Sequence, residues 1–282
     1  MIQDIAPSKF DNAFCMLSPR PEDYALLYGE QGVLASLAPC LRLPQIGALP
    51  PLPLRYAFSI DERRYFLGDA KAISPFGDYR FVASRDYRLL SPQDTAFACA
   101  VGESLHRWYR GTCFCGVCGT RMQDSETERA RVCPHCGSTV YPKICPAVIV
   151  AVTDGDRLLL TKYAGRAFRR YALIAGFNEI GETIEQTVHR EVYEETGLYV
   201  RALRFYKSQP WVLTDSLLLG FYAELDGSDA VRLLDGELSE AQWFSRDALP
   251  DDFSPISLTG EMITRFRDGR KAPAKAETAS HP

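Results

Sequence analysis

The sequence predicts an α/β protein in which a mixed, mainly β N-terminal domain and a small metal-binding ribbon precede a larger α/β domain. Three observations support this organisation: two pairs of cysteines near the middle of the chain, strand-like segments around an Asp-Gly turn, and an amphipathic helix with clear ends. A length of 282 residues favours two domains over one, and a hydrophobic content of 46% is sufficient for packed cores.

Composition excludes several classes of protein. The net charge of -4 gives no bulk electrostatic case for nucleic-acid binding. The first residues lack the basic stretch and apolar run of a secretory signal, and the apolar stretches Ala147–Val152 and Leu217–Phe221 are too short to span a bilayer. We therefore expect no membrane partner and a cytoplasmic location, where the nine cysteines remain reduced or bind metal.

Residues 1–111 form the first predicted domain. The pattern YAFSI, DERR, YFLGD predicts a hairpin across Asp61–Arg64. Ser91 is the expected N-cap of a helix, with Pro92 in its first position, Asp94 completing a capping-box-like pattern, and Gly111 at its end. Because this region contains no catalytic constellation, structural support or a dimer surface is the favoured interpretation.

Residues 112–141 contain two CxxC pairs separated by fourteen residues, a spacing typical of a tetrahedral zinc site. Four protein thiolates leave no position for water, so such a site is structural; the alternative is a set of free buried cysteines. The expected ligands are Cys115, Cys118, Cys133 and Cys136. Zinc ribbons often bind nucleic acids or proteins, but the loop between these pairs mixes both charge signs.

The remaining cysteines do not fit the paired spacing. Cys113 and His135 lie close to the pairs but break the pattern, so we do not expect them to bind the metal. Small, weakly polar thiols are common in protein cores. The cysteines expected there are Cys15, Cys40, Cys99 and Cys145.

Residues 142–270 have the pattern of an α/β domain. Ala147–Val152 and Arg157–Lys162 flank Asp154-Gly155, which predicts a hairpin. A strand in YALIAGF leads to a helix, further strands follow in YVRALRF, SLLLGFYAEL and AQWF, and Ser257–Arg267 is the expected closing helix. Residues 271–282 lack an apolar pattern and are expected to be disordered.

The central helix of this domain is expected at Ile184–Thr196. Thr183 and Gln186 have capping-box spacing, and Gly197 stands where a C-terminal glycine belongs. At 100° per residue, Ile184, Val188 and Val192 form one apolar stripe.

Three glutamates on this helix conflict with a solvated surface. Glu195 falls inside the apolar stripe, Glu191 beside it and Glu194 on its flank, one turn from Arg190. Carboxylates turned toward the protein are costly unless a cation neutralises them. A cluster of hard oxygen ligands suits Mg²⁺ or Mn²⁺, so the helix predicts a divalent-cation site.

These residues resemble a known family. From Gly176 to Leu198, GFNEIGETIEQTVHREVYEETGL matches the Nudix box GX5EX7REUXEEXGU, where U is aliphatic, at every fixed position. The resemblance implies the Nudix α/β/α sandwich. It also implies hydrolysis of nucleoside diphosphates linked to another group, with divalent cations bound by the glutamates of the box.

Other segments resemble the NADH pyrophosphatase branch of that family. They are the four-cysteine ribbon, YPKICPAVIV at Tyr141–Val150, and SQPW at Ser208–Trp211. The branch motif SQPWPFPxS is altered here, because Val212-Leu213-Thr214 replaces Pro-Phe-Pro. The resemblance implies cleavage of NADH or NAD⁺ to nicotinamide mononucleotide and AMP, and also suggests activity on NAD-capped RNA 5′ ends.

The same resemblance implies roles for individual residues. The implied Mg²⁺ or Mn²⁺ ligands are Glu191, Glu194, Glu195, Glu237 and the carbonyl of Ala175. Glu194 is also a candidate for deprotonating water, Arg190 orients the glutamates, and Glu182 is either structural or an extra ligand. The implied substrate contacts are Glu128, Tyr141, Phe177, Gln209, Pro210, Trp211, Ser216 and Thr259. Phe177 and Tyr141 would sandwich adenine, Tyr141 acting across a homodimer.

Two alternatives remain open from the sequence. One is hydrolysis of ADP-ribose or another nucleoside diphosphate derivative, which the altered Val212–Thr214 segment allows. The other is a zinc-ribbon regulator that binds nucleotides without cleaving them. An intact box, as found here, is not the pattern expected of a non-catalytic regulator.

Overall fold

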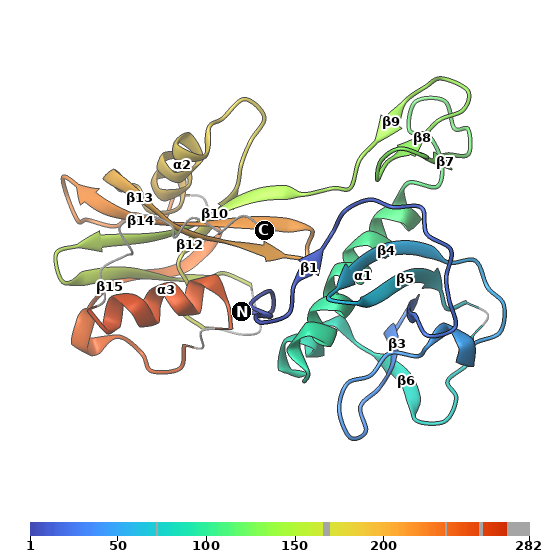
Figure 1. The fold of residues 1–282 in the computed structure, drawn as a ribbon. Coiled ribbons are helices and arrows are strands. Elements are labelled where there is room, and N and C mark those ends of the chain that lie inside the picture. Colours follow the sequence, from blue (N-terminus) through green and yellow to red (C-terminus); the bar gives the residue numbers. More distant parts are fainter. Residues whose placement is uncertain (72, 166–169, 235, 254–255, 270–282) are drawn as a thin grey trace. The chain divides into compact units, whose positions relative to one another are not determined.

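The fold comes from a computed structural model that describes residues 1–71, 73–165, 170–234, 236–253 and 256–269. The chain divides into two compact units (Figure 1). Ile2–Ile144 and Val212–Asp215 make up the N-terminal unit. The C-terminal unit comprises Met1, Cys145–Trp211 and the chain from Ser216 onward. Within the described residues, no helix is both long enough and apolar enough to cross a membrane.

The N-terminal unit is built on a six-stranded sheet of order β1-β4-β5-β2-β3-β6. Its strands are β1 (Phe10–Asp11), β2 (Tyr24–Gly29), β3 (Gly32–Ser36), β4 (Arg55–Ile60), β5 (Arg63–Asp69) and β6 (Tyr79–Val82). The β4–β5 pairing confirms the hairpin predicted from the sequence. Short 3-10 helices occur at η1 (Ile46–Ala48) and η2 (Ser84–Leu89).

Helix α1 (Gln93–Gly111) packs its apolar face against this sheet. The end at Gly111 is as predicted, but the start is not: Pro92 occupies the N-cap position in an extended conformation, and no side chain caps the helix. Ser91 therefore lies outside it. Asp94 is engaged elsewhere, because Arg63 of β5 donates to its carboxylate at 2.5 Å and the Thr95 N–H does so at 2.6 Å.

A buried ion pair lies in the same sheet. The Asp23 carboxylate is 5% exposed and accepts hydrogen bonds from Arg64 and from the backbone N–H of Arg20. Burial raises the pKa of Asp23, but these bonds outweigh burial and hold the pKa below its ordinary value of 3.8. The stabilisation is therefore complete above pH 3.8 and is lost as pH falls through the lower folded-state pKa.

Replacing Asp23 with Ala is expected to lower the free energy of unfolding by about 3 kcal/mol at pH 7, because it leaves the Arg64 side chain, which is only 17% exposed, without its partner. The difference from the unmodified protein should shrink as the pH falls below 3.8 and through the lowered pKa of Asp23, because the carboxylate of the unmodified protein then becomes protonated. Urea denaturation at several pH values measures this, with the exposed Asp78→Ala as control. If the loss of unfolding free energy in the Asp23 variant does not change with pH, the stabilisation does not come from the ion pair.

The ribbon follows α1 within the same unit. It contains a three-stranded sheet of β7 (Gln123–Asp124), β8 (Arg131–Val132) and β9 (Thr139–Val140). Its buried cluster is small, comprising Cys115, Met122 and Cys133 with Val140 packed against them. So few apolar contacts leave a metal ion as the main source of order.

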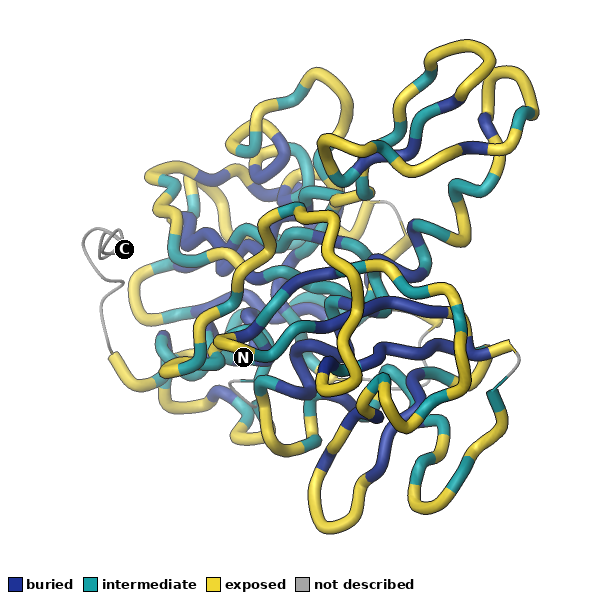
Figure 2. Tube along the Cα trace, turned by 45° about the vertical axis from the view of Figure 1, so that its right-hand side comes forward, coloured by how far each residue is buried: buried dark blue, intermediate teal, exposed yellow. Residues whose placement is uncertain are grey.

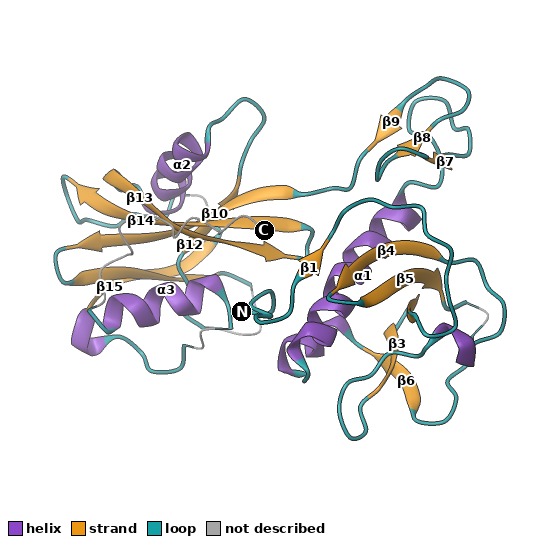
Figure 3. Ribbon diagram, in the orientation of Figure 1, coloured by secondary structure: helices purple, strands orange, loops and turns teal. Residues whose placement is uncertain are grey.

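The C-terminal unit is a three-layer sandwich with one helix on each face of a mixed sheet (Figures 1 and 3). The sheet order is β13-β14-β10-β11-β15, with β12 also paired to β10, and β10 and β14 run parallel. The strands are β10 (Cys145–Asp154), β11 (Arg157–Tyr163), β12 (Ile174–Phe177), β13 (Tyr199–Trp211), β14 (Ser216–Asp226) and β15 (Leu238–Ser245). This confirms the α/β/α architecture and the Asp154-Gly155 hairpin.

Alternation along β10 fills both cores. Val148, Val150 and Val152 face helix α2 (Ile184–Thr196), while Ile149 and Ala151 face helix α3 (Leu258–Arg267). Both faces of a central strand are thus covered, as its continuous apolar sequence predicts. Figure 2 shows the buried residues gathered along the strands, with exposed residues mainly in the connections. A 3-10 turn, η3 (Arg246–Ala248), follows β15. The expected disordered tail, 271–282, lies outside the described residues.

Candidate active site and zinc ribbon

Helix α2 has the bounds that its capping pattern predicts. The Gln186 N–H donates to the Thr183 hydroxyl at 3.2 Å, and the Thr183 N–H donates to the Gln186 side chain at 2.8 Å. Gly197 ends the helix in the left-handed conformation, with φ of 68°. Local sequence alone therefore fixes which way the glutamates of the helix face.

The three glutamates differ in burial as the helical periodicity predicts. Glu195 is 1% exposed, whereas the side chains of Glu191 and Glu194 are 13% and 51% exposed. A carboxylate as buried as Glu195 requires compensation by positive charge or hydrogen bonds. The cluster thus presents two inward-facing carboxylates and one that is accessible to water.

Arg190 contacts two carboxylates of this cluster, Glu191 and Glu194. Its Nη1 donates to Glu191 at 2.8 Å and to Glu194 at 3.0 Å. Its Nε and Nη2 form a fork on Glu182 at 2.6 and 2.9 Å, and Nη2 also donates to the carbonyl of Phe177 at 2.9 Å. One guanidinium therefore links the β12 end to three carboxylates and restrains their positions.

Glu182 is an anchor for Arg190 in this structure. The guanidinium is the main reason that the pKa of Glu182 is lowered to about 2, and the Thr187 hydroxyl donates to the same carboxylate at 2.9 Å. Asn178 donates to Thr187 at 2.7 Å. The motif comparison did not single out Thr187 or Asn178. The one sequence feature that could have indicated this contact is the position of Thr187 on the buried side of the helix.

Gly176 of β12 provides space for Glu191. A Cβ atom at this position would lie 1.8 Å from the carboxyl carbon of Glu191. The glycine of the box is therefore required by close packing of a carboxylate on the strand, because its backbone does not adopt a positive φ.

The electrostatics of Glu191 show that the acidic groups are close together. Burial raises its pKa, Arg190 opposes this, and the negative charges of Glu194 and Glu237 raise it further. Glu237 is itself exposed, and its carbonyl accepts the Ala164 N–H at 2.8 Å. Carboxylates close enough for two of them to raise the pKa of Glu191 are a suitable donor set for a divalent cation, which would relieve their repulsion.

The four cysteines of the ribbon form a second cluster. Their sulfur atoms lie within 4.8 Å of one another, Cys115 and Cys133 being buried and Cys118 and Cys136 exposed. Contact with the Thr120 hydroxyl and backbone is the main reason that the pKa of Cys118 is lowered to about 5, which favours the thiolate that zinc requires. Four soft sulfur donors, the number that a tetrahedral site requires, fit structural zinc.

The other cysteines are only partly as expected. Cys113 lies outside the cluster and donates to the Tyr109 carbonyl at 3.4 Å. Cys99 is buried and Cys145 is half-buried, but Cys15 and Cys40 are exposed, so the expectation of core positions is wrong for these two. Both lie in stretches outside the helices and strands, where an isolated cysteine carries no periodic signal.

Comparison with known proteins matches both regions of the chain, the one with the carboxylate cluster and the one with the four cysteines. The profile of the NUDIX domain matches residues 143–260, and that of the NADH pyrophosphatase zinc ribbon domain matches residues 112–141. A protein of Chromobacterium violaceum named NAD-capped RNA hydrolase NudC is 39% identical over 203 residues, covering 72% of this chain and 76% of its own.

The chain belongs to the Nudix hydrolase family.

Further relatives have the same name. The Haemophilus influenzae protein (strain PittGG) called NAD-capped RNA hydrolase NudC is 39% identical, covering 66% of this chain and 71% of its own. Among solved structures, a NUDIX hydrolase from Nitrosomonas europaea matches with 25% identity and a TM-score of 0.48, covering 56% of this chain and 91% of its own. Like other Nudix hydrolases, this one uses divalent cations, and it carries a structural zinc.

Within the C-terminal unit of this Nudix hydrolase, the implied substrate residues differ in accessibility. Phe177 is 55% exposed at the end of β12, beside the Arg190 cluster. Gln209 is fully buried, and its side-chain oxygen accepts the Leu258 N–H at the start of α3, next to Thr259. Ser216 is buried opposite Trp211 in the β13–β14 ladder, and Pro210 is half-buried. The structure therefore presents Phe177 to a ligand more openly than Gln209.

Two more implied contacts lie in the N-terminal unit and touch each other. The Tyr141 hydroxyl donates to Glu128 at 3.0 Å, and this bond raises the pKa of Tyr141. The Tyr141 ring is 57% exposed. The ribbon thus holds an aromatic face at its surface, with its hydroxyl fixed by a carboxylate.

The altered segment Val212–Thr214 is also held within the N-terminal unit. Arg107 of α1 donates to the Val212 carbonyl at 2.5 Å and to Asp215 at 2.6 Å. Ser104 donates to the same Asp215 oxygen at 2.6 Å. These side-chain bonds restrain a segment that lacks the two prolines of the family motif.

Replacing Gly176 with Ala is expected to lower kcat by about 10²-fold, because the new methyl group displaces the Glu191 carboxylate by an ångström or more. Steady-state kinetics with Mg²⁺ or Mn²⁺ measure this. Gly111→Ala is the control, since a Cβ there meets nothing within 4 Å and φ is not positive. Unchanged kcat in the Gly176 variant would mean that the Glu191 position is unimportant.

Proposed function

We propose that this Nudix hydrolase cleaves the pyrophosphate of NADH or NAD⁺ to nicotinamide mononucleotide and AMP, and also acts on NAD at the 5′ end of RNA. The observation that carries the proposal is the carboxylate cluster on α2. Arg190 donates to Glu191 and Glu194, Glu191 packs over Gly176, and Glu195 is buried on the same helix. The ribbon match and relatives named for NAD-capped RNA hydrolysis support the substrate class.

Each residue has a proposed part in the reaction. Glu191, Glu194, Glu195, Glu237 and the Ala175 carbonyl would hold Mg²⁺ or Mn²⁺, which supplies charge neutralisation of the pyrophosphate and a lower pKa for water. Arg190 fixes the carboxylates before substrate arrives, so little reorganisation is needed. Glu194 is half exposed and therefore reaches water, which suits it to accept the proton of the attacking water.

Recognition of the bases is proposed to use stacking. Phe177 and Tyr141 both present exposed aromatic faces, which suit an adenine ring. They lie in different units of the chain, and we propose that a homodimer supplies Tyr141 from the partner. The zinc ligands are proposed to be Cys115, Cys118, Cys133 and Cys136, and a cytoplasmic location would keep these thiols reduced.

Product analysis tests the proposal. NADH, NAD⁺, ADP-ribose and NAD-capped RNA are compared by kcat/KM, with and without added Mg²⁺ or Mn²⁺. We expect nicotinamide mononucleotide and AMP from NADH only when the cation is present. A clear preference for ADP-ribose would overturn the substrate assignment. The comparison of NADH with ADP-ribose is the sharpest one, because the altered Val212–Thr214 segment departs from the branch motif. No cleavage of any of them would favour a nucleotide-binding regulator.

A further inference from the structure

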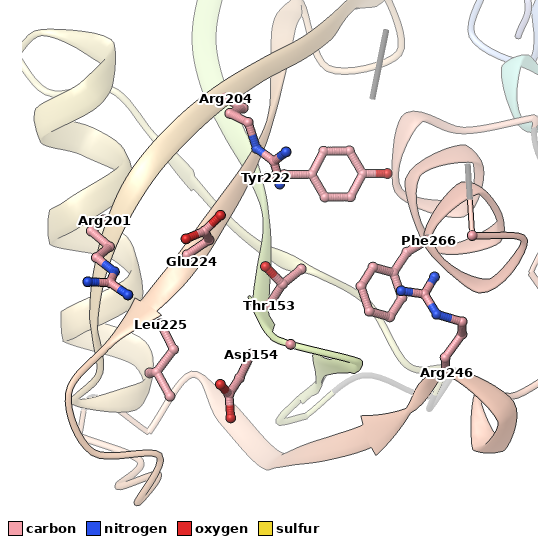
Figure 4. A pocket seen from close by; sticks show the side chains of 11 residues that line it. Thr153, Asp154, Arg201, Arg204, Tyr222, Glu224, Leu225, Arg246 and Phe266 are labelled. Atoms are coloured by element: carbon pink, nitrogen blue, oxygen red, sulfur yellow. The ribbon is translucent and has the colours of Figure 1, made fainter. Parts of the chain in front are cut away.

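A cavity of about 540 Å³ opens on the α3 side of the C-terminal unit (Figure 4). None of the residues that line it belongs to the carboxylate cluster. Its wall includes Thr153, Asp154, Arg201, Arg204, Tyr222 and Arg246. Thr153 lies five residues further along β10 than Val148, which pairs with Gly176. At about 3.3 Å per residue, the cavity is roughly 17 Å along the strand from that glycine.

A β-bulge brings two arginines to this cavity. Arg201 pairs with Glu224 and Arg204 pairs with Tyr222, so two residues of β13 oppose the single Ala223. Three positions apart on a regular strand, the arginines would face opposite sides of the sheet. The extra residue instead gives them the same face, while Leu203 packs into the core on the α2 side.

The bulge requires an unfavourable backbone conformation. Ala202 has a φ of 50°, which is rare for a residue with a side chain and costs of order 1 kcal/mol. β13 is an edge strand, and bulges with charged residues commonly protect such edges from pairing. Edge protection alone does not require that both charges line a cavity together with an arginine from another element.

The charges of the wall are not balanced. Within the part of the chain that is described, the side chains of Arg201 and Arg204 form no ion pair or hydrogen bond, and Glu224 is the wall's one acidic group without an ion-pair partner. Asp154 is already paired with Arg157. Arg246 is held in place by Asp156 at 2.5 Å and lies 4.2 Å from the centre of the Phe266 ring. Two unpaired guanidinium groups therefore face one unpaired carboxylate.

We propose that this cavity binds a phosphate monoester, with Arg201 and Arg204 as its principal ligands. A guanidinium matches terminal phosphate oxygens with two parallel hydrogen bonds, and two guanidiniums suit a dianion. The volume lies in the range of small-molecule sites, so a 5′-mononucleotide fits better than phosphate alone. The site does not depend on the hydrolytic function, because none of its residues belongs to the carboxylate cluster.

Isothermal titration calorimetry tests the site with the full-length, zinc-loaded protein and no added Mg²⁺ or Mn²⁺. The probes are AMP, inorganic phosphate and adenosine. We expect saturable binding of AMP, at least about tenfold weaker in the double variant R201Q/R204Q because charge-assisted bonds are lost. Arg232→Gln, an exposed arginine outside the cavity, is the matched control and should bind as the unmodified protein does.

Each outcome has a definite reading. Phosphate that binds as tightly as AMP would support the site, with free phosphate as its ligand, and weak binding of adenosine would support recognition of the phosphate. AMP binding that survives in R201Q/R204Q but disappears in Glu195→Gln would place the nucleotide in the carboxylate cluster and overturn the proposal. If neither AMP nor phosphate binds saturably, the proposal is wrong, and protection of the β13 edge is the remaining explanation for the two arginines. Both arginines are exposed, so the double variant should keep its melting temperature.

Discussion

Replacing Glu195 with Gln is expected to lower kcat for NADH hydrolysis by about 10³-fold, while the metal-free protein unfolds at the same temperature or higher. The two effects have one cause. Glu195 is 1% exposed on the apolar side of α2, where a neutral amide is less costly than a carboxylate. This result would show that the charge serves the metal site and not the stability of the helix.

The matched control is Glu185→Gln in the first turn of the same helix. Glu185 is exposed, so the identical chemical change there should leave kcat unaltered. Steady-state kinetics over a range of Mn²⁺ concentrations, with thermal unfolding of the metal-free proteins, measure both effects. If Glu195→Gln keeps its kcat, the inward-facing carboxylate does not hold the catalytic cation.

Replacing Cys133 with Ser is expected to abolish zinc binding and unfold residues 112–141. Structural zinc contributes about 10 kcal/mol or more, and the ribbon has only a small buried cluster to offset that loss. Limited proteolysis should then cut within the ribbon, while the sheet of the N-terminal unit stays protected. Zinc content per chain and the fragment pattern are the measurements.

Cys113→Ser provides the control, because this thiol is close to the cluster in sequence but lies outside it and donates to a backbone carbonyl of α1. It should keep its zinc and its resistance to protease. A Cys133 variant that retains a full equivalent of zinc would show that the metal is held by a different ligand set.

Local signals predicted the parts of the structure that local interactions determine. The bounds of α2 follow from Thr183, Gln186 and Gly197, and its burial pattern follows from helical periodicity. The start of α1 was predicted one residue early, because Arg63, distant in sequence, engages the Asp94 carboxylate.

Contacts between distant segments explain what the sequence could not show. The fit of Glu191 over Gly176 requires β12 to lie under the helix, and no periodic pattern specifies that distance. The bulge at Ala202 likewise has no signature, since alanine is an unlikely residue at positive φ and sequence reasoning would place Arg201 and Arg204 on opposite faces.

The parallel pairing of β10 with β14 determines when helix α2 can pack in its final position during synthesis. Cys145 pairs with Ser216, and about 60 residues, including all of α2, lie between the two strands. Contacts of such long sequence separation form late, after loop closure has been achieved. The chain must therefore be synthesised at least as far as Asp226 before the sheet beneath α2 is complete and its carboxylates acquire their final geometry.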